Sequence, residues 1–261
     1  MRYLRLMWLF IRVSIQDDAA YRIDFLTQLL MSVVQLGAEL VGVWTIFSNT
    51  RSLAGWNAME VLALLGVFRI MAGVITLFIA PNMRRIMEDI REGTLDFVLM
   101  KPINSQFYAS VRRAVVWRVA DIVLGIALAG LASAKLSAAW SLGGALLFAG
   151  MLMAGVTIIY SFWLVLATCA FWFTRLTNIE MVFWNVFEAG RYPVDIYRPW
   201  IRRGLTYVVP LAFLTTVPAG VLVGRADPAG VGAAVGLAAA SMAVSSWFWR
   251  HGLRHYSGAS A

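Results

Sequence analysis

Two histidines near the C-terminus come closest to a metal-binding pattern. His251 and His255 are four residues apart, so they would share one face of a helix. The sequence offers no third ligand near them, and Cys169, the single cysteine, lies in an apolar stretch. A solvated or headgroup-facing helix explains the two histidines better than a metal site does. We therefore expect no metal centre and no intramolecular disulfide bond.

Sequence motifs for catalysis are also missing. A P-loop requires a lysine directly after a glycine, and neither Lys101 nor Lys135 follows one. No G-x-S-x-G or H-E-x-x-H pattern occurs in the chain. We expect no catalytic residue and no cofactor bound by this chain, and therefore no enzyme activity of its own.

The composition is typical of a membrane protein. Of the 261 residues, 61% are hydrophobic and 14% are charged, and the mean hydropathy is +0.74. Soluble domains carry about 25% charged residues. The net charge of +8 would suit nucleic acid, but most basic residues lie between apolar runs, as on the cytoplasmic side of membrane proteins. We predict an all-α integral membrane protein that contacts lipids and does not bind nucleic acid.

Six membrane crossings can be placed along the chain. A crossing helix needs about 20 mostly apolar residues, and five runs approach or exceed this length: 25–47, 61–80, 115–132, 141–173 and 231–248. For the sixth crossing, hydropathy alone selects Leu205–Val223, and a shorter span at 177–190 is the alternative. Either choice puts both termini and most Lys and Arg residues on one side, the first choice more strongly. The positive-inside rule identifies that side as the cytoplasm.

Residues 1–18 are predicted to form an amphipathic helix that lies in the membrane interface. At helical spacing one face is apolar and the other polar: Leu4, Trp8, Ile11 and Ile15 on the first, and Arg5, Arg12 and Gln16 on the second. Asp17 and Asp18 follow where a signal peptide would need small residues for cleavage. A signal peptide is therefore not indicated.

Polar side chains inside two apolar runs are candidates for a transport pathway. They form one helical stripe in each run: Gln28, Ser32, Gln35 and Glu39 in the first, and Thr157, Ser161 and Thr168 in the fourth. Such stripes avoid lipid and point into a bundle or a pathway. Hydrogen bonding between packed helices would explain them equally well, so both interpretations stay open.

Arg69 lies eight positions inside the second apolar run. An unpaired guanidinium at that depth costs roughly a few kcal/mol, so it needs an acidic partner. Glu39 and Glu60 are the candidates. Glu39 lies eight residues before the end of its own run, so at 1.5 Å per residue both groups should lie about 12 Å deep. We predict an Arg69–Glu39 pair and favour a structural role for it over contact with substrate.

The segment Met83–Asn104 concentrates charge between the second and third spans. One face of a predicted helix would be apolar and the other ion-paired: Met83, Ile86 and Ile90 on the first, and the pairs Arg84–Glu88, Arg85–Asp89 and Glu88–Arg91 on the second. Gly93 suits the end of this helix, Thr94 the start of a second short turn, and Pro102 its end. The sequence therefore predicts a short two-faced helix in the cytoplasm.

Two stretches resemble the ABC-2-type permeases, the membrane subunits of bacterial ABC exporters. REGTLDFVLMKPIN, which begins at Arg91, is similar to the cytoplasmic loop of that family after its second span. FEAGRYPVDIYRPWIRRGLTYVVPLAF, Phe187–Phe213, is similar to its pattern of Gly, paired Pro, a helix and Pro-Leu before the last span. The resemblance covers essentially the whole chain. It is greatest to the ABC-2-like branch that includes viologen-type drug exporters.

The resemblance implies that the charged segment is a coupling helix, seated in a groove of a separate ATPase subunit that uses ATP and Mg²⁺. The residues assigned to that contact are Arg84, Arg85, Glu88, Asp89, Arg91, Glu92, Gly93, Thr94, Leu95 and Asp96. It also implies that Gly190–Val223 is an outer re-entrant hairpin, so that 177–190 becomes the fifth span. The hairpin residues are Tyr192, Pro193, Pro199 and Pro210; with Pro218, these prolines would interrupt a straight helix.

The function implied by the resemblance is that of a permease subunit in an ATP-driven exporter of the bacterial inner membrane. It would pair with a second permease, identical or a sibling, and work by alternating access. The expected substrate is amphiphilic, drug-like or lipid-like. The alternative is a membrane scaffold or channel-like protein without an ATPase partner. Co-purification of a chain with the G-x-x-x-x-G-K-[ST] motif would separate the two.

Overall fold

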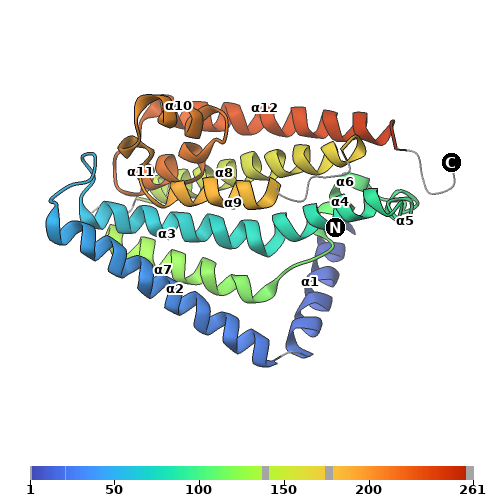
Figure 1. The fold of residues 1–261 in the computed structure, drawn as a ribbon, viewed down its shortest axis with the longest axis horizontal. Helices are drawn as coiled ribbons and strands as arrows, with labels where there is room; N and C mark the ends of the chain where they lie inside the picture. The colour runs from blue at the N-terminus through green and yellow to red at the C-terminus, as the bar shows by residue number, and fades with distance from the viewer. Residues whose placement is uncertain (1, 21, 137–140, 174–178, 257–261) are drawn as a thin grey trace.

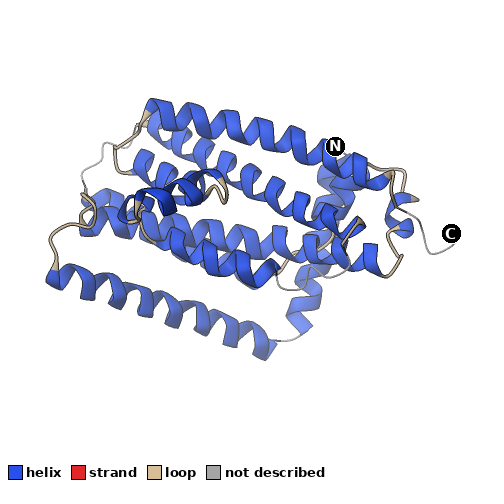
Figure 2. Cartoon of the chain, turned by 45° about the horizontal axis from the view of Figure 1, so that its top comes forward, coloured by secondary structure: helices blue, strands red, loops and turns tan. Residues whose placement is uncertain are grey.

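The computed structural model describes residues 2–20, 22–136, 141–173 and 179–256. Within these ranges every regular element is a helix, as Figure 2 shows, apart from an isolated β-bridge between Leu53 and Trp56. The long helices run side by side along one axis, and α1 (Arg2–Ala20) lies across them (Figure 1). The described chain is therefore a helical bundle with one transverse helix.

Five described stretches are long and apolar enough to cross a bilayer. They lie in α2 (Arg22–Asn49), in α3 (Ala58–Val74) with η1 (Ile75–Ile79) and α4 (Ala80–Arg91), in η2 (Val116–Arg118) with α7 (Val119–Lys135), in α8 (Leu142–Thr168) with η3 (Cys169–Phe171), and in α12 (Pro228–Leu253). Each overlaps one of the five apolar runs in the sequence. The shorter elements are α5 (Asp96–Leu99), α6 (Ser105–Val111), α9 (Ile179–Phe187), η4 (Glu188–Arg191), η5 (Val194–Ile196), α10 (Pro199–Tyr207), η6 (Ala212–Thr216) and α11 (Val217–Leu222).

The second crossing is one continuous helix of 34 residues, Ala58–Arg91, about 51 Å long at 1.5 Å per residue. A capping box at Asn57 and Glu60 begins it, and a π-helical turn at Ile75–Ile79 adds a bulge without ending it. Because the hydrocarbon core of a bilayer is about 30 Å thick, α4 extends beyond it. We call the end of the bundle where α4 lies the α4 end. The opposite end, where Trp56 precedes the long helix, is called the Trp56 end.

Helices α3 and α7 cross at unusually close range because two glycines face each other. A Cβ atom on Gly66 would lie 2.6 Å from the backbone nitrogen of Ala129 and 2.7 Å from the carbonyl oxygen of Gly125. A Cβ atom on Gly125 would lie 2.7 Å from the carbonyl oxygen of Gly66. Only glycine allows this backbone approach, which is a common way to pack helices in membranes.

The chain passes from one end of the bundle to the other between Glu180 and Asp195. Glu180 pairs with Arg84 at the α4 end, and the indole Nε1 of Trp56 donates to Asp195 at 3.4 Å at the Trp56 end. α9 has nine residues, about 14 Å, so it is too short to cross alone. The rest of the path is the η4 turn and extended backbone. Of the predicted span 177–190, residues 177 and 178 lie outside the described residues.

The segment after Asp195 starts and finishes at the same end of the bundle. Arg202 Nη2 lies 2.9 Å from Asp195 Oδ1, and Arg225 Nε lies 2.8 Å from Glu60 Oε1 beside the start of α3. Between them the pair formed by α10 and Ala212–Leu222 is bent by 75°. A straight crossing at Leu205–Val223 is therefore not the arrangement observed. Glu60, a candidate partner of Arg69, pairs with Arg225 instead.

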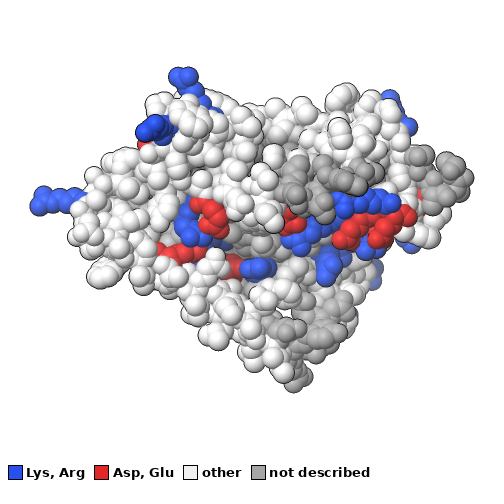
Figure 3. All heavy atoms as spheres, viewed as in Figure 1, with Lys and Arg blue, Asp and Glu red and all other residues white. Residues whose placement is uncertain are grey.

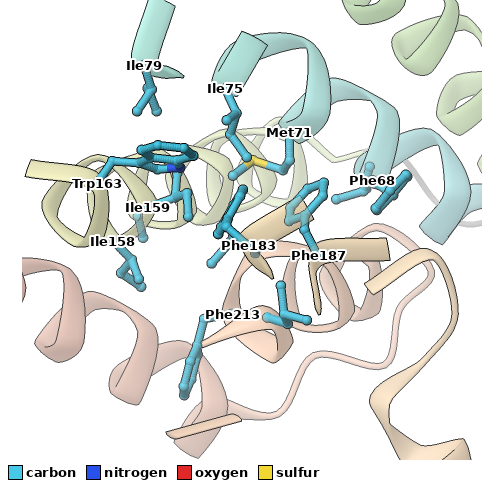
Figure 4. Packing of buried hydrophobic residues seen from close by; sticks show 14 of the residues in the cluster. Phe68, Met71, Ile75, Ile79, Ile158, Ile159, Trp163, Phe183, Phe187 and Phe213 are labelled. Carbon is cyan, nitrogen blue, oxygen red and sulfur yellow. The ribbon is translucent and has the colours of Figure 1, made fainter. Parts of the chain in front are cut away.

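The core lies between α3, α8, α9 and the bent segment (Figure 4). Phe187 of α9 stacks on Phe68 of α3 with ring centroids 4.9 Å apart, and Phe183 packs edge-on against Trp163 of α8 at 5.0 Å. These aromatic contacts fix the short α9 against the two longest helices. Gly155 of α8 leaves room for the bent segment, since its Cβ position lies 3.3 Å from the Phe213 carbonyl oxygen.

The transverse helix α1 exposes large apolar side chains, including Trp8, Val13 and Ile15. Its Ser14 is buried, and the hydroxyl accepts a hydrogen bond from the Ala114 backbone at 3.2 Å. An exposed apolar face on a transverse helix suits a membrane interface. The location of residues 1–18 in that interface stays a prediction.

Candidate functional site

Arg69 lies at the centre of a buried ion network. Its Nε donates to Glu39 Oε2 at 2.8 Å, and its Nη1 donates to Asp121 Oδ1 at 3.1 Å. Its Nη2 donates to the Ser32 carbonyl at 3.3 Å. Helices α2, α3 and α7 therefore meet at one guanidinium, whose residue is only 3% exposed. The predicted Glu39 partner is present, and Asp121 is a second partner that the sequence analysis missed.

Further charged groups extend this network on both sides of Arg69. Arg118 Nη1 lies 3.1 Å from Asp121 Oδ2, and Arg191 Nη2 lies 3.5 Å from Glu39 Oε1. Arg191 also pairs with Glu188. Three arginines and three carboxylates thus alternate, and their formal charges cancel. Such compensation, with hydrogen bonds to the charged groups, is what makes ionised side chains tolerable at low dielectric.

A cavity of about 230 Å³ lies beside the network. Its lining includes the charged groups Glu39, Arg69, Arg118, Asp121 and Glu188 together with Trp184 and Phe187 of the α9 region. On the face shown in Figure 3, charged side chains gather over the middle of α3 and again over α4. Since Arg69 lies about 17 Å along its helix from Ala58, the cavity lies near the middle of the bundle.

The polar stripe of α2 divides into two parts. Ser32 and Glu39 are buried, and Gln35 lines the cavity, where its Nε2 donates to Glu39 Oε1 at 3.4 Å. Gln28 is exposed on the outside of the bundle and does not line this cavity. The structure therefore brings the C-terminal part of the stripe, and not its start, to the network.

The hydroxyls of α8 bond mainly within their own helix. Thr157, Ser161 and Thr168 each donate to the carbonyl four residues earlier, at 2.7–2.8 Å. Ser161 and Thr168 are buried against neighbouring helices, and none of the three lines the cavity beside Arg69. This geometry favours packing over pathway lining for Ser161 and Thr168.

The charged segment after the second span begins as a continuation of the long helix and not as a separate helix. α4 continues α3, with Met83 and Ile86 fully buried, and it ends at Arg91. Gly93 follows with φ +71°, a left-handed conformation that glycine adopts without strain. The short α5 comes next, and Pro102 lies beyond it. The predicted buried face and both predicted ends agree with these positions.

The turn between α4 and α5, which we call the corner, is stabilised from its buried side by Asp89. Its carboxylate lies 3.1 Å from Arg85 Nε and 2.6 Å from Arg112 Nη2, and it accepts from the Thr94 hydroxyl at 3.2 Å. Its carbonyl accepts from the backbone of Thr94 and Leu95. Asp89 and Leu95 are buried, so neither can contact an ATPase directly. Their roles in the predicted coupling surface are therefore structural.

Two of the three predicted ion pairs on α4 are wrong. Arg84 pairs with Glu180 of α9 instead of Glu88, because α9 passes beside α4 and a carboxylate from another element is closer. Glu88 pairs with Arg85 at 3.5 Å and not with Arg91. The pair of Arg85 with Asp89 is confirmed.

The exposed tip of this region consists of α5 and the residues around it. Phe97 and Met100 are 65% and 70% exposed, and Leu99 lies beside them. Arg91 and Glu92 are also exposed. Apolar side chains exposed beyond the bilayer, with charges around them, are typical of a protein contact. Phe97 and Met100 were not predicted to be part of this surface, although their place in the REGTLDFVLMKPIN stretch could have indicated them.

A buried amide connects this corner to the spans. Asn82 is fully buried; its Nδ2 donates to the carbonyls of Phe78 and Arg113, each at 2.7 Å, and its Oδ1 accepts from the Arg113 backbone at 2.9 Å. The Leu77 carbonyl, inside the π-helical turn, accepts from the Val115 backbone at 3.0 Å. The segment before α7 is therefore held directly on the bulge of the long helix.

The sequence profile described as "ABC-2 family transporter protein" matches residues 33–260. The chain belongs to the ABC-2 transporter family. It is an all-α, multi-pass membrane protein, the permease component of an ABC transporter, in which a separate subunit carries the ATPase activity. Permeases of this family work with ABC ATPase partners. A comparison with curated proteins found no match.

The parts of the ABC-2 chain singled out in the sequence lie at separate places in the bundle. The α5 tip is exposed, and the Arg69 network lies inside the bundle. One helix, Ala58–Arg91, carries Arg69 and ends beside the tip. The residues of the predicted hairpin also have defined places: Pro193 is buried, Pro199 begins α10, Pro210 precedes η6, and Tyr192 packs on the core.

Proposed function

We propose that the chain is the permease subunit of an ATP-driven exporter in the bacterial inner membrane, with the α4 end in the cytoplasm. The observation that carries the proposal is the continuous helix Ala58–Arg91. It runs without a break from the Arg69 network to Arg91, where the Gly93 turn leads into the exposed tip at α5, so a displacement of the tip would act on the network through this helix. The basic residues of the α4 end support this orientation.

The tip would seat in a groove of the ATPase subunit, which binds and hydrolyses ATP with Mg²⁺. Phe97 and Met100 provide apolar contact area there, and Arg91 and Glu92 surround it with charge. Asp89 and Asn82 make the corner stiff, since both are buried and bonded on several sides. A stiff corner transmits motion that a flexible loop would absorb. A second permease subunit, identical or a sibling, would complete the pathway by alternating access.

An amphiphilic substrate is supported by a second cavity of about 660 Å³ between α6, α8 and α12. Its walls are mainly apolar, and a polar cluster lies on one side: Gln106 Nε2 donates to the Tyr160 hydroxyl at 3.2 Å and to Ser246 at 3.1 Å. Among the residues that the structure describes, no charged side chain lines it. Cavities of this size and lining suit drug-sized amphiphiles.

The coupling assignment can be tested with a complex of this permease and its ATPase in nanodiscs. Reversal of both exposed carboxylates, Glu88→Lys with Glu92→Lys, should abolish the stimulation of ATP hydrolysis by amphiphilic compounds while the permease still inserts. Arg51→Glu, a charge reversal at the Trp56 end, is the matched control and should leave the stimulation unchanged. Normal binding and stimulation in the Glu88/Glu92 variant would show that this segment does not couple the two subunits.

A further inference from the structure

A third cavity, at the α4 end, is surrounded by arginines. It has a volume of about 320 Å³ and lies between α4 and the segment that leads into α7. Arg84, Arg85, Arg113 and Arg118 all line it, whereas Glu88 is the one carboxylate among the described residues of its lining. We propose that this cavity binds the phosphate headgroup of an anionic membrane lipid.

The nearby carboxylates that the structure describes leave one arginine of this cluster without an acidic partner. Asp89, which pairs with Arg85, is shared with Arg112, and Asp121, which pairs with Arg118, is shared with Arg69. Arg84 pairs with Glu180, and Arg85 also lies 3.5 Å from Glu88, so Arg84, Arg85 and Arg118 each have an acidic partner. The Arg113 side chain has no ion-pair partner among the described residues. A positive potential therefore remains in the cavity, and a phosphate would be attracted to it.

An unpaired donor belongs to the same cavity. The indole of Trp117 lines it, and within the described part of the chain the buried Nε1–H of Trp117 has no hydrogen-bond acceptor. A buried donor without a partner costs about 1–3 kcal/mol. A phosphate oxygen could accept from this N–H and from the guanidinium groups at once. The donors fit an anion, since a cation would find only Glu88.

The depth of the cavity indicates a lipid and not a soluble anion. Arg84 lies about 39 Å along the helix from Ala58. This is more than the hydrocarbon core of about 30 Å and less than the roughly 40–45 Å of a bilayer with both headgroup layers. The transverse α1 lies at the same level, because its Ser14 bonds to Ala114, next to Arg113. A lipid phosphate in the surrounding leaflet would thus reach the cavity from the side, with its acyl chains still in the bilayer.

Native mass spectrometry of the detergent-purified permease can test this site without ATP or an ATPase. The protein would be mixed with phosphatidylglycerol or phosphatidylcholine, and the retained lipid counted. We expect the wild type to retain phosphatidylglycerol preferentially. Arg113→Gln should weaken that retention about tenfold, as expected for the loss of one charge-assisted hydrogen bond. Trp117→Phe, which removes only the N–H donor, should weaken it as well, while Arg51→Gln at the Trp56 end should not.

Three outcomes would overturn the proposal. Equal retention of phosphatidylglycerol by the wild type, Arg113→Gln and Trp117→Phe would exclude this cavity as the site. Equal retention of the two lipids would exclude recognition of negative charge. Complete displacement of phosphatidylglycerol by millimolar inorganic phosphate would assign the cavity to a free anion. The exporter function could fail independently of all three, since the measurement requires no transport.

Discussion

Arg69 on α3 and Glu39 on α2 form a salt bridge with Nε and Oε2 2.8 Å apart, and both side chains are almost completely buried. α2 is otherwise largely exposed along its length, with Leu30, Val34 and Val41 on the outside. This contact is therefore a principal attachment of α2 to the bundle. A helix held by so few polar contacts could move relative to its neighbours if the network rearranged.

The Arg69–Glu39 pair should show strong energetic coupling. Arg69→Ala leaves two buried carboxylates without their shared partner, so we expect a loss of about 3–5 kcal/mol in the free energy of unfolding. Adding Glu39→Ala should recover part of it, which unfolding by SDS in mixed micelles can measure. The pair Arg85–Glu88, in which both side chains are about half exposed, is the control, and Glu88→Ala should cost at most about 1 kcal/mol. If the losses for Arg69→Ala and Glu39→Ala were strictly additive, the two side chains would not be energetically coupled.

The crossing of α3 and α7 depends on glycine at one position and not at another. Gly125→Ala would place a Cβ 2.7 Å from the Gly66 carbonyl oxygen, so the helices must separate. We expect a loss of about 2–4 kcal/mol in unfolding free energy or failure to fold. Gly130→Ala on the same helix meets nothing within 4 Å and should be neutral or slightly stabilising. Equal stability of the two variants would contradict the observed crossing.

The amide of Asn82 should be essential for the contact between the long helix and the segment that leads into α7. Asn82→Leu keeps a similar volume but leaves the Arg113 backbone groups without partners, at a cost of about 2–4 kcal/mol. The measurement is the thermal unfolding midpoint, together with ATPase stimulation in the complex. Asn49→Leu, at an exposed helix end, is the control. If both variants behave alike, the Asn82 hydrogen bonds do not stabilise this contact.

Periodicity and depth in the sequence predicted part of this arrangement. Met83 and Ile86 are buried as their spacing indicates, and Glu39 meets Arg69 because matched depth along two connected helices fixes their level. Asp121 could not be found in this way. Its approach depends on the Gly66–Gly125 contact, in which the second and third spans meet through backbone atoms. No pattern of side chains in the sequence reveals such a contact. Arg84 was assigned to Glu88 because local spacing gives no information about α9.

The path after α9 places Arg202 at the Trp56 end, outside the membrane in the proposed orientation. In a Cys169→Ala background, a cysteine at Arg202, whose side chain is 56% exposed, should react with an impermeant thiol reagent on intact cells. Arg51→Cys in the α2–α3 loop is the positive control, and Met100→Cys at the α5 tip should react only after lysis. If the cysteine at position 202 reacted only after lysis, this position would be cytoplasmic and Leu205–Val223 would cross the membrane.

The contact between the α5 tip and an ATPase is the central claim, and photocrosslinking tests it most directly. A benzophenone side chain would replace Phe97, which is 65% exposed, and Tyr207, which is 78% exposed near the bent segment, would serve as the control position. In cells that express the whole transporter, we predict an adduct at position 97, and none at 207, with a chain that carries the G-x-x-x-x-G-K-[ST] motif. An adduct with that ATPase at position 207 and none at 97 would contradict the account.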